Sequence, residues 1–307
     1  MPREITSLHV DQALSNFARD YRNGGFQGHR IFPIFPVLKE SDKYHIFTKR
    51  DAFRSEETLK GTNSAPRIKE WSVSTDSFAC EEHALRGIIP DRERNNSDPA
   101  IDIEGKTVED LTDSLLLAYE IRVAAIVTST GNITQNTTLS GTSQWSDFTN
   151  SNPITDVRTG RNTIHKATGK NPNRCAMGRE VFDKLVDHPD LLERIKYTRE
   201  GITTEQLIAA LFGVEELLVC EALKDSANEG QTASLAYAFG KDLLLFYADD
   251  KPSKRTVSLG WTFAAQDLLV KRKRNDDIDA DMFDVGHIVD EKLVAADCGY
   301  LIKNAVA

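Results

Sequence analysis

The sequence lacks the motifs that most often identify an enzyme or an exported protein. It contains no H-E-x-x-H, no G-x-S-x-G, no Walker A sequence and no G-x-G-x-x-G. None of its 7 histidines pairs with another at a metal-ligand spacing. The first residues have no apolar signal-peptide core, and no apolar run is long enough to span a bilayer. We therefore predict no catalytic, cofactor-binding or metal-binding residues, no cofactor, and no membrane association.

Cysteine is also scarce. Cys80, Cys175, Cys220 and Cys298 are widely separated and form no C-x-x-C, which predicts reduced, mostly buried thiols in a reducing cytoplasm. The formal net charge of -9 argues against a dedicated nucleic-acid binder, although one face of the protein could still lie near DNA. With 307 residues, 40% hydrophobic and 28% charged, the chain is typical of a soluble globular protein with one large or two interleaved domains.

Three charged clusters merit inspection as sites. They are Glu81-Glu82-His83, the acidic set Asp276, Asp277, Asp279, Asp281 and Asp284, and the basic run Lys271-Arg272-Lys273-Arg274. The first is interpreted as a solvated stretch, because adjacent residues on a helix point apart. The second superficially resembles a calcium loop, but the required glycine and closing glutamate are out of register. The third could contact phosphates, but alternating strand residues flanked by acid favour a solvated sheet edge.

One long helix is expected from Lys106 to Ser129. Thr107 is the expected N-cap, Asp110 completes an acidic variant of a capping box, and Gly131 ends the element. The C-terminal half is apolar almost all round, so it must be covered on several sides by the chain or by neighbouring copies. Glu120 and Arg122 interrupt this apolar run, which argues against a membrane span.

The N-terminal part predicts an arm followed by an extended excursion. A short amphipathic helix is expected around 11–21, and Pro33 and Pro36 favour extended chain after it. Strands are expected on both sides of a turn at 40–42, and 67–75 is expected to be a returning strand. Residues 37–75 therefore form a predicted two-stranded excursion. Because isolated hairpins are marginal in water, it should lean on another surface, and a partner subunit is one candidate.

The rest of the chain predicts a mixed α/β region. We expect a short helix or irregular segment at 78–89, a charged loop at 91–99 and a folded loop at 132–151. Helices are predicted at 154–168, 179–186, 190–195 and 203–212, and strands at 174–178, 216–223, 243–248 and 256–270. A polar loop at 224–236 and one or two strands within 285–301 complete the set.

Several stretches carry a family resemblance. They are GKNPNRCAMGREVFDKLVDHPDLLERIKY after a helix, the expected helix 203–212 followed by LLVCEAL, and the terminal CGYLIKNAV. In this order, after an arm, an extended hairpin and a long helix, the chain resembles a tailed-bacteriophage major capsid protein of the Hong Kong 97 type. The resemblance implies an α+β fold with an N-terminal arm (1–36) and an extended loop (37–75). It further implies a peripheral domain (76–153 and 251–307) with a spine helix (107–128), and an axial domain (154–250).

The resemblance also implies a role. It implies pentamers and hexamers that form an icosahedral shell around double-stranded DNA, in a virion assembled in the host cytoplasm. Expected partners are a separate scaffolding protein, a portal protein and a possible decoration protein. Only about 30 residues precede Pro33, so either the scaffold is a separate protein or an extension has been cleaved. Some relatives form Lys–Asn crosslinks, but Lys49, Lys60 and Lys69 near the loop are expected to be solvated charges.

Two other functions stay open at this point. An encapsulin-like nanocompartment would keep the fold and hold a protein cargo in a peptide groove on its inner face. A cytoplasmic α/β enzyme with an unrecognised site would instead be a monomer with a deep pocket and clustered titratable residues.

Overall fold

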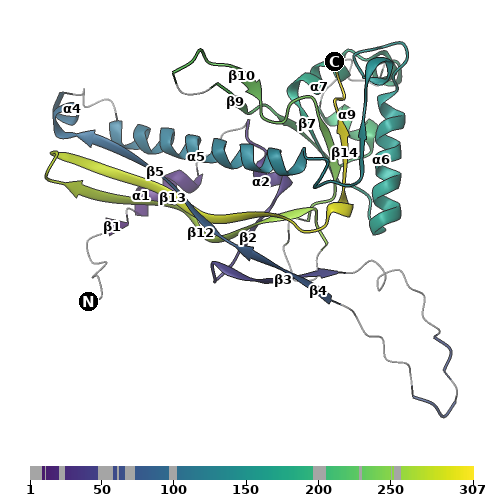
Figure 1. Cartoon of the computed structure of the whole chain (residues 1–307), viewed down its shortest axis with the longest axis horizontal. Coiled ribbons are helices and arrows are strands. Elements are labelled where there is room, and N and C mark those ends of the chain that lie inside the picture. The colour runs from purple at the N-terminus through teal and green to yellow at the C-terminus, as the bar shows by residue number, and fades with distance from the viewer. Residues whose placement is uncertain are drawn as a thin grey trace.

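The computed structural model describes residues 9–10, 12–20, 25–47, 58–60, 62–65, 73–96, 102–195, 205–227, 230–249, 251 and 257–307. One β-sheet lies alongside a long helix, a second lies at the C-terminal end of that helix, and a two-stranded ribbon leaves the body beside them (Figure 1). The expected α+β class is confirmed. Among the described helices, none combines the length and the apolar character needed to cross a membrane.

The first sheet is built on a long antiparallel hairpin. Strands β12 (Gly260–Asn275) and β13 (Ala280–Leu293) form the hairpin, and β5 (Glu81–Pro90) pairs antiparallel with β13. On the other side of β12, β1 (His9–Val10) pairs antiparallel and β2 (Ile34–Pro36) pairs parallel. The N-terminal arm is therefore part of the sheet that the C-terminal region builds.

Helix α5 (Ile103–Val127) runs along the first sheet and reaches the second (Figure 1). The helix begins at Ile103, three residues before the expected Lys106, so Thr107 as N-cap and Asp110 in its capping box were wrong. The side chain of Asp102 accepts a hydrogen bond from Gly105 N at 3.0 Å and caps the helix instead. The helix is buried on several sides, as predicted: Val108 packs with the first sheet and Val123 with the second.

The second sheet has the order β6 (Asn136–Thr138), β14 (Gly299–Lys303), β11 (Leu243–Phe246), β7 (Arg174–Gly178) and β8 (Glu216–Cys220). Apart from the edge strand β6, its strands are buried on both faces. One face packs against the helices α6 (Pro153–Thr168), α7 (Arg179–Val186), α8 (Pro189–Ile195) and α9 (Glu205–Phe212). The other face packs against the end of α5 and the arm.

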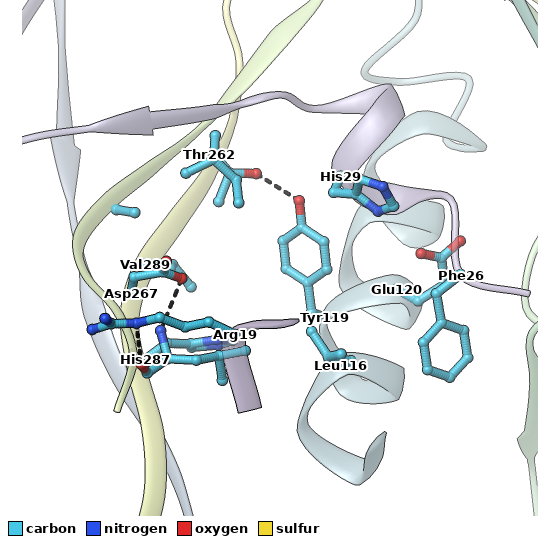
Figure 2. Close-up of a pocket in the computed structure, with 13 residues that line it drawn as sticks. Arg19, Phe26, His29, Leu116, Tyr119, Glu120, Thr262, Asp267, His287 and Val289 are labelled. Atoms are coloured by element: carbon cyan, nitrogen blue, oxygen red, sulfur yellow. Dashed lines mark hydrogen bonds between the residues drawn. The ribbon is translucent and has the colours of Figure 1, made fainter. Parts of the chain in front are cut away.

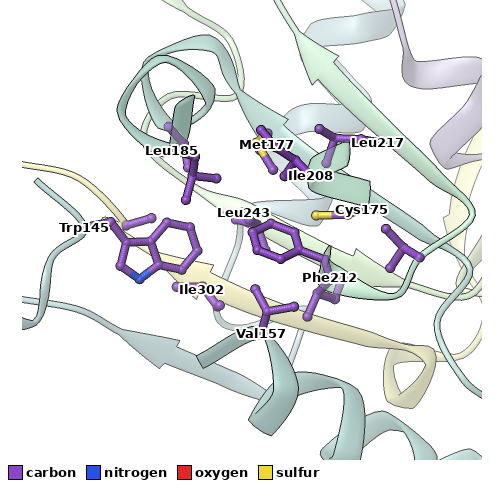
Figure 3. Packing of buried hydrophobic residues seen from close by; sticks show 14 of the residues in the cluster. Trp145, Val157, Cys175, Met177, Leu185, Ile208, Phe212, Leu217, Leu243 and Ile302 are labelled. Carbon is purple, nitrogen blue, oxygen red and sulfur yellow. The ribbon is translucent and has the colours of Figure 1, made fainter. Parts of the chain in front are cut away.

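The helical face of the second sheet holds the largest buried cluster (Figure 3). Met177 and Leu243 from the strands meet Val157 and Phe212 from the helices in it. Trp145 from the segment before α6 is fully buried there, and its Nε1 donates to Asp156 Oδ2 at 2.9 Å. This confirms that 132–151 is folded, although it contains the unpredicted strand β6 as well as the 3-10 turn η1 (Gly141–Ser143).

For the helices that cover the second sheet, signals in the neighbouring sequence were sufficient to predict each element. The side chain of Asn152 accepts from Thr155 N, Pro153 occupies the first turn of α6, and Gly169 ends it in the left-handed conformation at φ 70°. The predicted helices α6, α7 and α8 and the strand β7 are confirmed to within one residue. Of the helix predicted at 203–212, the structure describes α9 from Glu205.

Elsewhere the sequence misled. Residues 78–89 are not helical or irregular: they lie in β4 (Val73–Ala79) and β5. The predicted loop 91–99 begins with a helix, α4 (Asp91–Asn96). The polar loop 224–236 lies within a small hairpin of β9 (Leu223–Asp225) and β10 (Leu235–Tyr237). In each case the partner strand or packing surface is distant in sequence or the element is very short.

The arm and the excursion are largely as expected. The predicted helix near 11–21 is α1 (Gln12–Asp20), and a short helix α2 (Gly28–Ile31) follows that was not predicted. Strand β3 (Ser41–Phe47) pairs antiparallel with β4, which confirms a two-stranded excursion, called the ribbon below. The turn expected at 40–42 was wrong, because Ser41 and Asp42 belong to β3, and the returning strand is described from Val73 and runs on to Ala79. Most of its tip lies outside the described residues. A final 3-10 turn, η2 (Ala296–Cys298), precedes β14.

Candidate assembly elements

A buried carboxylate holds the arm against α5. Glu120 is 2% exposed, and its two oxygens accept hydrogen bonds from the backbone of the arm: Gln27 N at 3.2 Å and Gly28 N at 2.5 Å. Burial raises the pKa of Glu120, although the two backbone hydrogen bonds oppose the shift. A Cβ on residue 28 would lie 2.6 Å from Glu120 Oε2, so this approach requires glycine.

A second anchor joins Phe32, four residues after Gly28 in the arm, to α5 and β12. Tyr119 and Thr262 hydroxyls are 2.7 Å apart, and both reach the carbonyl oxygen of Phe32, at 3.4 and 3.2 Å. The side chains of Ile31 and Phe32 are buried in the cluster between α5 and the second sheet. This part of the arm is therefore a component of the core rather than a segment lying on the surface.

The ribbon is rooted in aromatic side chains. Phe78 stacks on Phe263 with ring centroids 4.4 Å apart, and Tyr44, Phe35 and Trp261 complete the cluster. At the same place Ala79 N donates to Asp290 Oδ2 at 2.9 Å. Leu38, just before β3, and Leu59, in the described part of the tip, are almost fully exposed. The ribbon thus has a fixed base, and its described outer part has no local core.

Ion pairs tie the tip of the first sheet to α4 and α5. Asp281 accepts from Arg94 Nη2 at 2.5 Å and from Arg272 Nη2 at 2.7 Å, and both arginines also contact Glu104. Arg274 pairs with Asp91. Burial alone would raise the pKa of Asp281, but the hydrogen bonds from the two arginines outweigh it and lower that pKa.

This arrangement corrects the interpretation of the basic run. Lys271 and Arg272 are not at a free sheet edge, because they pair with β1 on the side of β12 away from β13. Among the described residues, β1 does not reach Lys273 and Arg274, which are exposed. Arg272 and Arg274 are engaged by acidic partners from three elements. Of the acidic set, Asp276, Asp281 and Asp284 are in ion pairs, and Asp276, Asp277 and Asp279 lie at the hairpin turn. No group of metal-ligating side chains occurs among the residues that the structure describes.

The strength of the tip network can be measured. Replacing Asp281 with alanine should lower the free energy of unfolding by ~2 kcal/mol, because two partly buried arginines lose a charged acceptor. Urea titration at pH 7 would measure this change. Because the folded pKa of Asp281 is depressed, its contribution is present above the unfolded value of about 3.9 and is lost as the pH falls through the folded value.

The matched control is Asp276→Ala, whose side chain is 93% exposed and pairs with the same strand. It should change stability by less than about 0.5 kcal/mol. Equal effects of the two substitutions would show that the network contributes nothing specific.

The remaining candidates are placed as follows. Glu81, Glu82 and His83 lie on strand β5 rather than on a helix; Glu81 and Glu82 are exposed, and His83 makes an edge contact with His287. None of the cysteines is in a disulfide; three are buried and Cys80 is half-buried, as predicted. Lys60 is exposed, whereas Lys49 and Lys69 lie outside the described residues.

Ser151 and His188, which the sequence did not single out, are arranged like the serine and histidine of a catalytic dyad. Ser151 Oγ lies 3.0 Å from Nε2 of the buried His188. However, His188 Nδ1 accepts a hydrogen bond from Asp190 N, so the ring proton is on Nε2 and is donated to the serine. Ser151 in turn donates to the carbonyl of Asp147 at 2.7 Å. The imidazole cannot accept the serine proton in this arrangement, so the pair ties the loop to α8 and does not activate a nucleophile.

Comparisons with known proteins agree with the family resemblance expected from the sequence. The family model for phage major capsid protein E matches residues 131–257. The chain is 28% identical over 309 residues to the major capsid protein of Pseudomonas phage JBD67, covering 97% of each chain. A phage-related protein from Bordetella bronchiseptica has a similar structure, with a TM-score of 0.79 and 28% identity over 98% of this chain and 99% of that one. The capsid structure of cyanophage P-SCSP1u, at 12% identity, gives a TM-score of 0.63 over 89% and 86% of the two chains.

The arm built into the core, the rooted ribbon and the helix joining two sheets, together with the solved capsids, define a subunit with the Hong Kong 97-type capsid fold. The resemblance expected from the sequence is confirmed in role as well as in fold. The chain is similar to phage major capsid proteins over nearly its whole length, at 28% identity, and the family model for such a protein matches its residues 131–257.

Proposed function

We propose that the protein assembles as pentamers and hexamers into an icosahedral shell that encloses double-stranded DNA. The observation that carries this proposal is the ribbon. Its base is fixed by five aromatic side chains, yet its exposed Leu38 and Leu59 have no local core to join. A neighbouring subunit would supply that surface, as repeated contacts do in closed assemblies. The net charge of -9 suits a shell that binds its DNA only weakly, because each Lys or Arg contact with a phosphate strengthens DNA binding.

We further propose that successive segments of the chain form different parts of the capsid subunit. Residues 1–36 act as the N-terminal arm, 37–75 as the loop over an adjacent subunit, and the first sheet with α5 as the peripheral domain. Residues 154–250 form most of the axial domain. The sheet order favours one change from the boundaries expected from sequence. Strands β6 and β14 pair within the second sheet, so 136–138 and 299–303 are better assigned to the axial domain.

The remaining parts of the proposal concern assembly. A separate scaffolding protein directs shell formation in the host cytoplasm, a portal protein occupies one vertex, and a decoration protein is a possible addition. The role is structural, without catalysis. The tautomer of His188 supports this point, since it leaves the best-placed serine without a general base.

Electron microscopy with light scattering tests the proposal. The purified chain, alone and with a lysate of phage-infected host cells as a source of scaffold, should give closed shells tens of nanometres across or stable pentamers and hexamers. Shells from infected cells should contain nuclease-resistant double-stranded DNA. Protein cargo in place of DNA would instead support an encapsulin-like compartment. A monomer or dimer under every salt and pH condition, with lysate present, would contradict the assembly proposal.

A further inference from the structure

A cavity of about 120 Å³ lies where the arm, α5 and the first sheet meet (Figure 2). Its walls come from α1, from the arm, from α5 and from strands β12 and β13: Arg19, Phe26, His29, Ile34, Leu116, Tyr119, Glu120, Thr262, Ala264, Asp267, Leu268, His287 and Val289. A cavity of about 150 Å³ with apolar walls holds benzene in another protein. The space here is somewhat smaller, so one six-membered ring is the largest group that we expect it to hold.

The walls select against charged ligands. Most of the lining surface is apolar, from side chains such as Leu116, Leu268 and Val289. Glu120 already uses both oxygens for the arm backbone, and together with Asp267 it would repel an anion. Arg19, whose Nε donates to Leu268 O at 3.0 Å, would repel a cation. Because burying a charge without a partner is costly, the ligand that fits best is neutral.

His287 adds a polar requirement. The residue is 5% exposed, and its Nε2 is buried without a hydrogen-bond partner in the part of the chain that the structure describes. Burial lowers the pKa of His287 to about 4, with Arg122 and His83 adding to the shift, so the ring is neutral at pH 7. A hydroxyl group can donate to or accept from an imidazole nitrogen, so it fits either tautomer. Unsatisfied buried polar atoms are uncommon in native proteins and often mark an unseen partner.

We propose that this cavity binds a neutral, ring-sized molecule with one hydroxyl group, of the phenol class. The ring lies among Leu116, Leu268 and Val289, and the hydroxyl pairs with His287. A bound molecule contacts the arm, α5 and the first sheet together, so it fastens the arm to the body. This site is independent of the shell proposal, since all of its walls belong to one chain.

Three probes of similar size test the site: phenol, toluene and benzoate. Ligand-observed NMR titrations of the folded subunit at pH 7 give their dissociation constants. Phenol should bind about fivefold more tightly than toluene, the effect of one net hydrogen bond, and benzoate should bind more weakly than both. His287→Leu should reduce the phenol-to-toluene ratio to near one. The control is His83→Leu: His83 contacts His287 with ring centroids 5.7 Å apart but does not line the cavity, so the ratio should be kept.

A second variant examines the space itself. Ala264→Leu places a larger side chain on the wall and should weaken phenol and toluene alike. If it fails to fold, intermolecular NOEs from phenol to the methyl groups of Leu116 and Val289 in the wild-type chain decide the location. Absence of saturation at millimolar phenol, equal affinity for phenol and toluene, or a ratio unchanged in His287→Leu would each overturn the proposal.

Discussion

Replacing Phe32 with alanine should lower the free energy of unfolding of the subunit by ~3–5 kcal/mol, the range for truncating a fully buried phenylalanine. Phe32 is in the arm, yet its side chain is fully buried between α5 and the second sheet. Its ring lies against Gly260, where an added Cβ would come within 2.4 Å of Phe32 Cε1. Loss of the ring therefore opens a cavity at the junction of the two sheets. Urea titration of unassembled subunits would measure the change.

The control for this substitution is Leu38→Ala. Leu38 lies six residues further along the chain and is fully exposed, so truncation should change stability by less than about 0.5 kcal/mol. If Phe32→Ala costs no more than Leu38→Ala, the arm is not docked in the free subunit and docks only on assembly. The measurement thus separates an arm that belongs to the subunit core from one that the shell recruits.

The parts of the fold that the sequence predicted are those with local signals. Helix α6 has Asn152 as cap, Pro153 in its first turn and Gly169 at its end, and all three signals lie within the element or next to it. Likewise, β7 is a short apolar run buried on both faces, and its neighbours α7 and α8 are separated where Pro189 begins the second helix. Such signals need no knowledge of the rest of the chain.

The failures come from long-range pairing. Strand β5, EEHALRGIIP, has no apolar alternation that would identify it, and its conformation is set by antiparallel pairing with β13 some 200 residues away. The start of α5 was misplaced because Gly105 discourages a helix in isolation, whereas the cap by Asp102 decides the outcome. Arg272 and Arg274 were expected to be solvated because their partners Glu104 and Asp91 are distant in sequence.

For the arm, the ribbon and the long helix, too, only the features with local signals were predicted. The sequence predicted that the arm and the excursion lack a local core and that the long helix needs covering on several sides. It could not show that the arm itself provides part of that cover. Glu120 was noted only as a residue that interrupts an apolar run. Its role depends on backbone N–H groups of residues 27 and 28, which carry no sequence signal except the glycine.

The contact between Glu120 and the arm backbone gives the second large expected effect on stability. Glu120→Ala should lower the free energy of unfolding by ~3 kcal/mol, because it leaves two backbone N–H groups at a buried site without their acceptors. Glu120→Gln should cost ~1–2 kcal/mol, since the amide oxygen still accepts one of the two hydrogen bonds. Urea titration gives these values, and amide hydrogen exchange of Gln27 and Gly28 should accelerate in both variants. Asp110→Ala, at an exposed position of the same helix, should leave exchange and stability unchanged.

Gly28 makes the contact testable by a double-mutant cycle. Gly28→Ala in the wild-type background sets a methyl group 2.6 Å from Glu120 Oε2 and 3.0 Å from Tyr119 Cε1, so it should destabilise by ~2–3 kcal/mol. In the Glu120→Ala background the closer of these clashes is absent, and the same substitution should cost at least 1 kcal/mol less, within the range for residues in contact. Additive effects would mean that the arm does not approach α5 this closely in solution. A clear coupling would establish that the close fit of Gly28 against Glu120 fixes the arm before any neighbour is present.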